Sequence, residues 1–436
     1  MSTRKNIILN GIASVFAKTV RIADQLLLVP FFLTAWGSAY YGEWLTLSAI
    51  PSILAFADLG FGTATSNAFV LNYRGGKKQL SADYYVTGLR LVSGSVVIGI
   101  LLTAIIMGVA WFSGLLDKSL INPNDAILAM LFLMTSRFVS FYNQVYEAFY
   151  RTTHHAARAT NLITVEGFLR IGISILVLML GYGVVALSLS QLLIIIVFNI
   201  AYALYGRSMI KDLPKGNWDR NIAGETVKKG LAFLANPLWQ AIYYQGSTFV
   251  VRAMLGPSAV AVFNTVRTLC RSINQVFNIV SLAVFPELQI AVGDSNMPLA
   301  RKILRKSMRL VLVSSIIGIV GLLIFGKPVY NWWTKNMLEV PDLIWYMFMA
   351  GLLFNALWFT SSVVYKAVNQ PYRFAMFSLI SAVVSVALSY FLSYPLGLVG
   401  VSIGYVFLDV LMTILVMPYA CKLLGMSWRE VFANHN

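Results

Sequence analysis

The residues with the clearest chemical potential in this sequence are charged side chains that fall inside long apolar segments. An ionised side chain in the hydrocarbon core of a membrane costs a few kcal/mol, so such residues usually face a wet cavity, a partner or a substrate. The basic residues placed in this way are Lys18, Arg21, Arg90, Arg137, Arg170, Arg252, Arg267 and Arg271.

The spacing of the deepest basic residues indicates an anionic ligand. Lys18 and Arg21 share one helical face (i, i+3), and Arg267 and Arg271 share another (i, i+4). Stacked like charges repel each other, which favours an anionic group between them. We therefore predict a substrate-binding set of Lys18, Arg21, Arg137, Arg170, Arg267 and Arg271. The alternative is internal pairing, as Arg21 with Asp24 or Arg170 with Glu166.

Deep carboxylates form a second candidate set. A buried acid can hold a proton at neutral pH or coordinate a sodium ion, so each is a candidate for energy coupling. The set consists of Asp24, Asp58, Glu166 and Asp409. Asp24 and Glu166 also qualify as salt-bridge partners. Asp58 and Asp409 have no basic neighbour within one helical turn and are the stronger coupling candidates.

The elements that must position these residues are membrane-spanning helices. Among the 436 residues, 58% are hydrophobic and only 11% are charged, which excludes a water-soluble globular enzyme and a disordered chain. A spanning helix needs about 20 apolar residues. We predict twelve spans, at 7–33, 42–70, 85–112, 126–150, 158–180, 183–206, 229–254, 258–285, 307–326, 342–365, 373–394 and 397–421.

The net charge of +16 is mostly a consequence of topology. With the N-terminus cytoplasmic, most Lys and Arg residues fall on inside segments, whereas the outside loops hold only Lys118, Lys327 and Lys335. This distribution predicts that both termini are cytoplasmic. It also removes nucleic acid as the reason for the charge. The apolar span that follows Arg4 and Lys5 is too long for a cleavable signal peptide.

Two halves of the sequence resemble each other. The segment 89–100 (LRLVSGSVVIGI) aligns with 308–319 (MRLVLVSSIIGI) at an offset of 219, and Gly37 and Gly256 are separated by the same offset. Six helices per half return the chain to its starting side, so the halves would be parallel repeats. We expect two six-helix lobes around a central cavity, at 1–207 and 229–436, joined by a cytoplasmic linker at 208–228.

Other chemistry is not indicated. Cys270 and Cys421 fall in or at the end of apolar helices, where two buried hydrophobic side chains are expected rather than a disulfide. His154, His155 and His435 lie in a loop or the tail. The sequence has no metal or nucleotide motif and no concentrated acid, base or nucleophile set in its outer loops. We predict no metal, no cofactor and no enzymatic activity.

Several segments together resemble the O-antigen and polysaccharide flippases, which belong to the multidrug/oligosaccharidyl-lipid/polysaccharide exporter superfamily. The resemblance covers essentially the whole chain. In that family, a proline ends the eighth helix and a basic amphipathic segment leads into the ninth. The resembling segments are Tyr41-Gly42-Glu43-Trp44, Ala57-Asp58-Leu59-Gly60-Phe61-Gly62, Phe285-Pro286-Glu287-Leu288, Leu299-Ala300-Arg301-Lys302 and Gly397-Leu398-Val399-Gly400.

The resemblance implies a flippase of the bacterial inner membrane. Its substrate would be an oligosaccharide repeat unit on undecaprenyl diphosphate, moved outward by alternating access. A diphosphate suits an arginine-rich cavity. The implied partners are this lipid-linked oligosaccharide, membrane lipids, a coupling proton or sodium ion, and other polysaccharide-assembly proteins. Two alternatives stay open: a cation-coupled multidrug exporter of the same fold, and a membrane-embedded polysaccharide polymerase or ligase.

Overall fold

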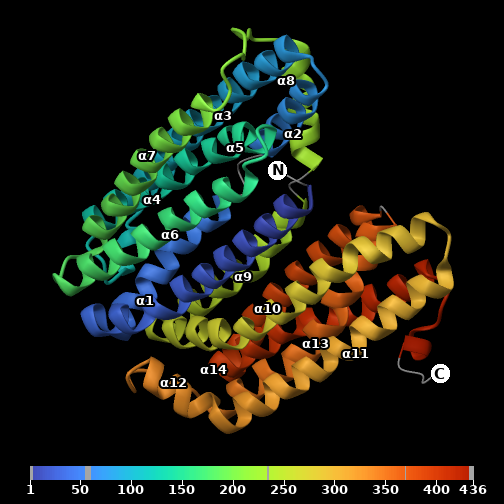
Figure 1. Cartoon of the computed structure of the whole chain (residues 1–436). Helices are drawn as coiled ribbons and strands as arrows, with labels where there is room; N and C mark the ends of the chain where they lie inside the picture. Colours follow the sequence, from blue (N-terminus) through green and yellow to red (C-terminus); the bar gives the residue numbers. More distant parts are fainter. Residues whose placement is uncertain (1–2, 55–59, 233–234, 369, 432–436) are drawn as a thin grey trace. The chain divides into compact units, whose positions relative to one another are not determined.

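The computed structural model is all-helical over the residues that it describes, which are 3–54, 60–232, 235–368 and 370–431 (Figure 1). The chain divides into two compact units, Met1–Pro237 and Leu238–Asn436. The prediction of an all-α polytopic membrane protein is confirmed. Nine described helices are long and apolar enough to cross a membrane.

The first unit is built mainly from eight helices. They are α1 (Thr3–Leu54), α2 (Phe61–Arg74), α3 (Lys78–Phe112), α4 (Pro123–Ser140), α5 (Tyr142–Thr152), α6 (Ala156–Met179), α7 (Val184–Ser208) and α8 (Arg220–Ala232). Helix α1 packs on α4 and α6, and α4 packs on α7. Helix α2 packs on α3, α5 and α8.

The second unit contains six helices. They are α9 (Ala235–Leu255), α10 (Pro257–Gly293), α11 (Met297–Gly321), α12 (Lys327–Trp333), α13 (Asp342–Ala367) and α14 (Pro371–Leu423). Helix α13 packs on α10, α11 and α14 and is the most buried of the candidate spans. The functional candidates of this unit therefore lie around α13.

Glycines with positive φ lie at three places where the sequence predicts a break between spans, two of them inside helices and one between α9 and α10. Gly37 has φ 71° and ψ 174° inside α1, and Gly256 has φ 86° and ψ 177° before α10. This conformation is essentially restricted to glycine, and the two residues hold it 219 positions apart. Gly397, with φ 55°, bends α14 in the same way. Helix α14 thus carries two predicted spans, and α1 carries the span 7–33 and the first part of the span 42–70.

Some predicted boundaries are wrong. Helix α10 does not end at Pro286 but continues to Gly293, because a proline removes one backbone hydrogen bond and can be accommodated as a kink. The basic segment before the ninth span is continuous with it, as helix α11. The predicted span 42–70 includes residues 55–59, which lie outside the described part of the chain, and Asp58 is one of them.

The polar segment after α7 lies against the first unit. Gly216 approaches the backbone of Ala82 so closely that a Cβ atom would stand 2.1 Å from the Ala82 carbonyl oxygen. The Asn217 amide donates to Asp83 Oδ1 at 2.7 Å. Tyr84 donates to Glu225 Oε2 at 2.5 Å, which fixes α8 to α3. The segment is therefore held along its length.

Candidate functional site

The first unit collects opposite charges from three helices. Arg170 of α6 forms an ion pair with Asp24 of α1 at 3.5 Å. Arg137 of α4 lies within electrostatic range of both residues and of Glu166, which is buried on α6. Two cations thus face two carboxylates. The pairing of Arg170 with an acid, the alternative to substrate binding, is present here, and Asp24 joins Glu166 as its partner.

The remaining candidates of this unit are less defined. Lys18 lies on α1 with a partly exposed side chain. Arg21 lies on the same helix, but its side chain is outside the described part of the structure, as is the whole of Asp58. The roles of Lys18 and Arg21 in substrate binding remain predictions.

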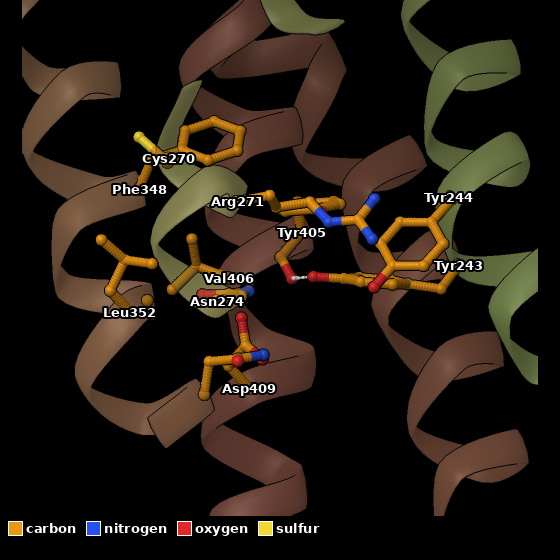
Figure 2. A pocket seen from close by; sticks show the side chains of 12 residues that line it. Tyr243, Tyr244, Cys270, Arg271, Asn274, Phe348, Leu352, Tyr405, Val406 and Asp409 are labelled. Carbon is orange, nitrogen blue, oxygen red and sulfur yellow. Dashed lines mark hydrogen bonds between the residues drawn. The ribbon is translucent and has the colours of Figure 1, made fainter. Parts of the chain in front are cut away.

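The second unit brings Arg267, Arg271 and Asp409 together from α10 and α14. Arg271 and Asp409 line a small pocket of about 30 Å³ (Figure 2), and Arg267 lies beside it, against the lining residues Tyr244 and Tyr405. The other lining residues come from α9, α10, α13 and α14: Tyr243, Tyr244, Cys270, Asn274, Phe348, Gly351, Leu352, Asn355, Tyr405 and Val406.

Arg267 is buried and its hydrogen-bonding groups are engaged. Its guanidinium donates to the Tyr244 carbonyl oxygen at 2.8 Å, to Thr248 Oγ1 at 3.4 Å and to Asn264 Oδ1. It also lies 5.5 Å from the ring centroid of Phe263 and 5.9 Å from that of Tyr405. A buried cation with this many partners joins α9 to α10, so its first role is to hold the wall of the pocket.

Arg271, one turn further along α10, differs from Arg267 in its exposure and its contacts. Its side chain is exposed, and its guanidinium stacks over the ring of Tyr244 at 3.9 Å from the centroid (Figure 2). Stacking on an aromatic face leaves the edge N–H groups of a guanidinium available to donate to two oxygens of an acceptor such as a phosphate. Arg271 is therefore the basic residue of this unit best placed to meet a ligand.

Asp409 is the acidic residue that lines the same pocket as Arg271. It is 6% exposed, and its Oδ1 accepts from Asn355 Nδ2 and from Trp358 Nε1, both at 2.8 Å. Arg271 exerts an electrostatic attraction on it. The prediction that Asp409 lacks a basic partner within one turn of its own helix is consistent with this arrangement, because its partners come from α13 and α10.

Two amide oxygens at the pocket have no hydrogen-bond partner among the described residues. They are Asn274 Oδ1 and Asn355 Oδ1, both buried. Together with the Asp409 carboxylate they provide oxygen ligands of the kind that a hard monovalent cation or a proton would use. No cluster of three or more His, Cys, Asp or Glu side chains suited to a metal ion occurs within the described residues.

Sequence reasoning missed the partners that decide these roles. Asn355 and Trp358 lie in the apolar run of α13, and Tyr243 and Tyr244 lie in α9. The Tyr243 hydroxyl donates to the Tyr405 carbonyl oxygen at 3.1 Å, which ties α9 to α14. A polar Asn355 within an otherwise apolar span was the one available signal for the Asp409 site.

Comparison with known proteins identifies the fold. No family model matches the sequence, and no curated protein matches it. Among solved structures, an inward-facing multidrug resistance MATE family transporter of the MOP superfamily has a TM-score of 0.74 and 18% identity, with 96% of each chain covered. An outward-facing one has a TM-score of 0.65 and 16% identity, covering 100% of this chain and 98% of that one.

A third similar structure is a MOP superfamily transporter from Pyrococcus furiosus, described by the reverse polarity of its binding pocket, which suggests a different function. It has a TM-score of 0.64 and 18% identity, and the match covers 98% of this chain and 97% of that one. At these identities the likeness establishes the fold. The chain therefore has the fold of the MATE transporters of the MOP superfamily.

Proposed function

We propose that this protein is a membrane transporter that moves an amphiphilic anion by alternating access. The fold supports the transport mode, because solved transporters that share it are described in both inward-facing and outward-facing conformations. A purely anchoring or enzymatic protein would not require two compact helical units of this kind.

The observation that carries the anionic substrate is the accessible guanidinium of Arg271. Arg271 lines the second unit's pocket and Arg267 lies beside it, and among the described residues Asp409 is the carboxylate that lines it. The region around the pocket therefore has one more cation than carboxylate, and the pocket has an aromatic wall of Tyr243, Tyr244 and Tyr405. A phosphate group offers two oxygens that can accept side by side from the planar guanidinium of Arg271.

The finer proposal is a lipid-linked oligosaccharide flippase. Its substrate would be a sugar repeat unit on undecaprenyl diphosphate, moved from the inner to the outer leaflet of the bacterial inner membrane, with both termini of the protein in the cytoplasm. The sequence resemblance to polysaccharide flippases supports this substrate. The transporter from Pyrococcus furiosus, described by its reversed pocket polarity, is a precedent within the fold for a different function.

The second candidate function is a cation-coupled multidrug exporter. The solved structures favour this class over the flippase, because the inward-facing and outward-facing structures named above are described as multidrug resistance transporters. The Asp409 site also favours a coupling cation, since a buried carboxylate and two unpartnered amide oxygens lie at one pocket. The two candidates differ in the charge of the substrate, so one experiment can separate them.

The experiment measures binding of undecaprenyl diphosphate and of the cationic dye ethidium to the purified chain and to Arg271→Gln. A charge-assisted hydrogen bond is worth about 1.5–3 kcal/mol, so Arg271→Gln is expected to weaken undecaprenyl diphosphate binding about tenfold or more. Lys366→Gln removes an exposed cation from α13 outside the pocket and serves as the control.

The outcomes are distinct. Selective loss of undecaprenyl diphosphate binding in Arg271→Gln, with Lys366→Gln unchanged, supports the anionic substrate. Ethidium binding that improves in Arg271→Gln, with no detectable binding of undecaprenyl diphosphate to the unsubstituted chain, assigns the pocket to cationic drugs and overturns the flippase.

A further inference from the structure

A second concave site lies in the first unit, away from the charged cluster. It is an apolar groove of about 440 Å³ along α3, lined also by Phe61 of α2 and Phe138 of α4. Helix α3 presents Ile98, Leu102 and Ile106 to it. From Arg90 to Ile106 the helix rises about 24 Å, which exceeds the thickness of about 15 Å that one leaflet contributes to the hydrocarbon core.

Two glycines of α3 shape this groove. A Cβ atom on Gly99 would stand 2.4 Å from the ring of Phe138, so glycine is required there for α4 to approach α3. A Cβ atom on Gly94 would meet nothing within 4 Å. Gly94 is thus a notch in the helix surface that no side chain of the described protein fills.

The notch is specific to the first repeat. Helix α11 keeps the corresponding arginine and glycine, as Arg309 and Gly318, but has Val313 at the position of Gly94. The Val313 side chain is 54% exposed and covers the surface that Gly94 leaves open. Helices α3 and α11 therefore share the arginine and one glycine, but only α3 has the open notch.

The mouth of the groove is basic and aromatic. The Arg90 side chain is exposed, and its guanidinium lies 6.0 Å from the ring centroid of Trp218 in the polar segment after α7. Among the described residues, Arg90 has no carboxylate partner. Tryptophan and arginine at the end of a span mark the level of lipid headgroups.

From this geometry we infer that the groove binds one anionic glycerophospholipid of the surrounding bilayer. Arg90 contacts the phosphate, Trp218 lies beside the headgroup, and one acyl chain runs along α3 over the notch at Gly94. The charge of the mouth and the apolar length of the groove match the two ends of such a lipid. Basic pockets between spanning helices are known to take anionic headgroups.

The test uses native mass spectrometry of the full purified chain with equimolar phosphatidylglycerol and phosphatidylethanolamine of the same acyl composition. We expect one phosphatidylglycerol to be retained in preference. Loss of one basic residue near a membrane surface is worth about 1 kcal/mol, so Arg90→Gln should lower its affinity about fivefold, and Arg90→Lys should retain most of it.

The steric half of the proposal is tested by Gly94→Leu, which fills the notch and whose Cβ atom meets nothing within 4 Å. Gly108→Leu is the matched control, because Gly108 lies on the same helix, also has open space at its Cβ position and does not line the groove. Phosphatidylglycerol binding should fall in Gly94→Leu and persist in Gly108→Leu. Both variants replace glycine in a helix and should fold.

Three results would overturn the proposal. The first is equal retention of the two phospholipids, and the second is unchanged binding in Arg90→Gln or Gly94→Leu. The third is tighter, Arg90-dependent binding of undecaprenyl phosphate that displaces phosphatidylglycerol, which would assign the groove to a polyprenyl chain. None of these results depends on the transport activity, so the proposed function can fail or succeed independently.

Discussion

At the scale of single residues, neighbouring arginines of α10 have different environments. Hydropathy identified both Arg267 and Arg271 as deep charges. It could not show that Arg267 already donates hydrogen bonds within the protein. The answer lies on α9, where the Tyr244 carbonyl oxygen and Thr248 accept from Arg267. Such partners are distant in sequence, so the division of roles had to come from the structure.

The first prediction concerns this pair. Arg267→Gln removes the buried guanidinium and its hydrogen bonds to the Tyr244 carbonyl oxygen, Thr248 and Asn264, which should cost about 1–3 kcal/mol of unfolding free energy. Arg271→Gln removes an exposed stacked group and should change stability by less than about 1 kcal/mol while weakening anion binding. Thermal unfolding and ligand binding, measured on both purified variants, check the contrast; equal destabilisation would contradict it.

The second prediction concerns Asp409. In Asp409→Asn the amide oxygen can still accept from Asn355 and Trp358, so the variant should fold with nearly unchanged stability. It can no longer carry a proton or a full negative charge for a cation. Transport in vesicles with imposed proton or sodium gradients should therefore lose its gradient dependence. If the dependence survives in Asp409→Asn, coupling must be sought at Asp24, Asp58 or Glu166.

At the scale of elements, the lengths of the apolar segments and the positions of glycines between them predicted most of the helices. The bend at Gly397 was readable because the long charge-free run 374–408 must reverse, and glycine or proline marks the place. The passage of α10 through Pro286 was not readable, because a proline can end a helix or only kink it, depending on the packing around it.

The third prediction tests the repeated backbone conformation. Gly256→Ala places a Cβ atom on a residue with φ 86° and ψ 177°, which should cost about 1–3 kcal/mol through backbone strain alone, because no atom lies within 4 Å of the new Cβ atom. Gly108→Ala, at an open helical position, should be neutral or stabilising by up to about 1 kcal/mol. Thermal unfolding of the two variants distinguishes these effects. Equal stability changes in Gly256→Ala and Gly108→Ala would exclude backbone strain at residue 256.

The fourth prediction concerns the polar segment after α7. Hydrogen bonds, first from Lys78 and then from Tyr73, lower the pKa of Asp212 to about 2. Because the folded pKa is depressed, the stabilising contact is fully present above the ordinary pKa of about 4 and is lost as the pH falls toward 2. Between pH 5 and 8 the contact should therefore be insensitive to pH.

Asp212→Asn at pH 7 should loosen this segment much as acid does. The readout is tryptic cleavage after Lys215, whose carbonyl oxygen accepts from Gln79 at 3.0 Å in the closed arrangement. Cleavage should accelerate in Asp212→Asn and stay unchanged in Asp294→Asn, which removes an exposed carboxylate elsewhere. Equal cleavage rates would show that Asp212 does not hold the segment.

At the scale of the whole molecule, the net charge of +16 has two parts. Most of it follows from the predicted topology. The part relevant to function is small: in the first unit, Arg137 and Arg170 face Asp24 and Glu166, whereas the pocket region of the second unit has two arginines against Asp409. The sequence showed the deep excess of positive charge but could not assign each cation its partners, because these lie on other helices.

The central claim is that the transported molecule is an anion. The most direct measurement compares outward transport of an undecaprenyl-diphosphate-linked oligosaccharide with that of ethidium, in vesicles containing the purified protein. The account predicts translocation of the lipid-linked oligosaccharide, its loss in Arg271→Gln, and no ethidium transport. Ethidium transport that persists in Arg271→Gln, with the lipid-linked oligosaccharide left in its original leaflet, would contradict the claim.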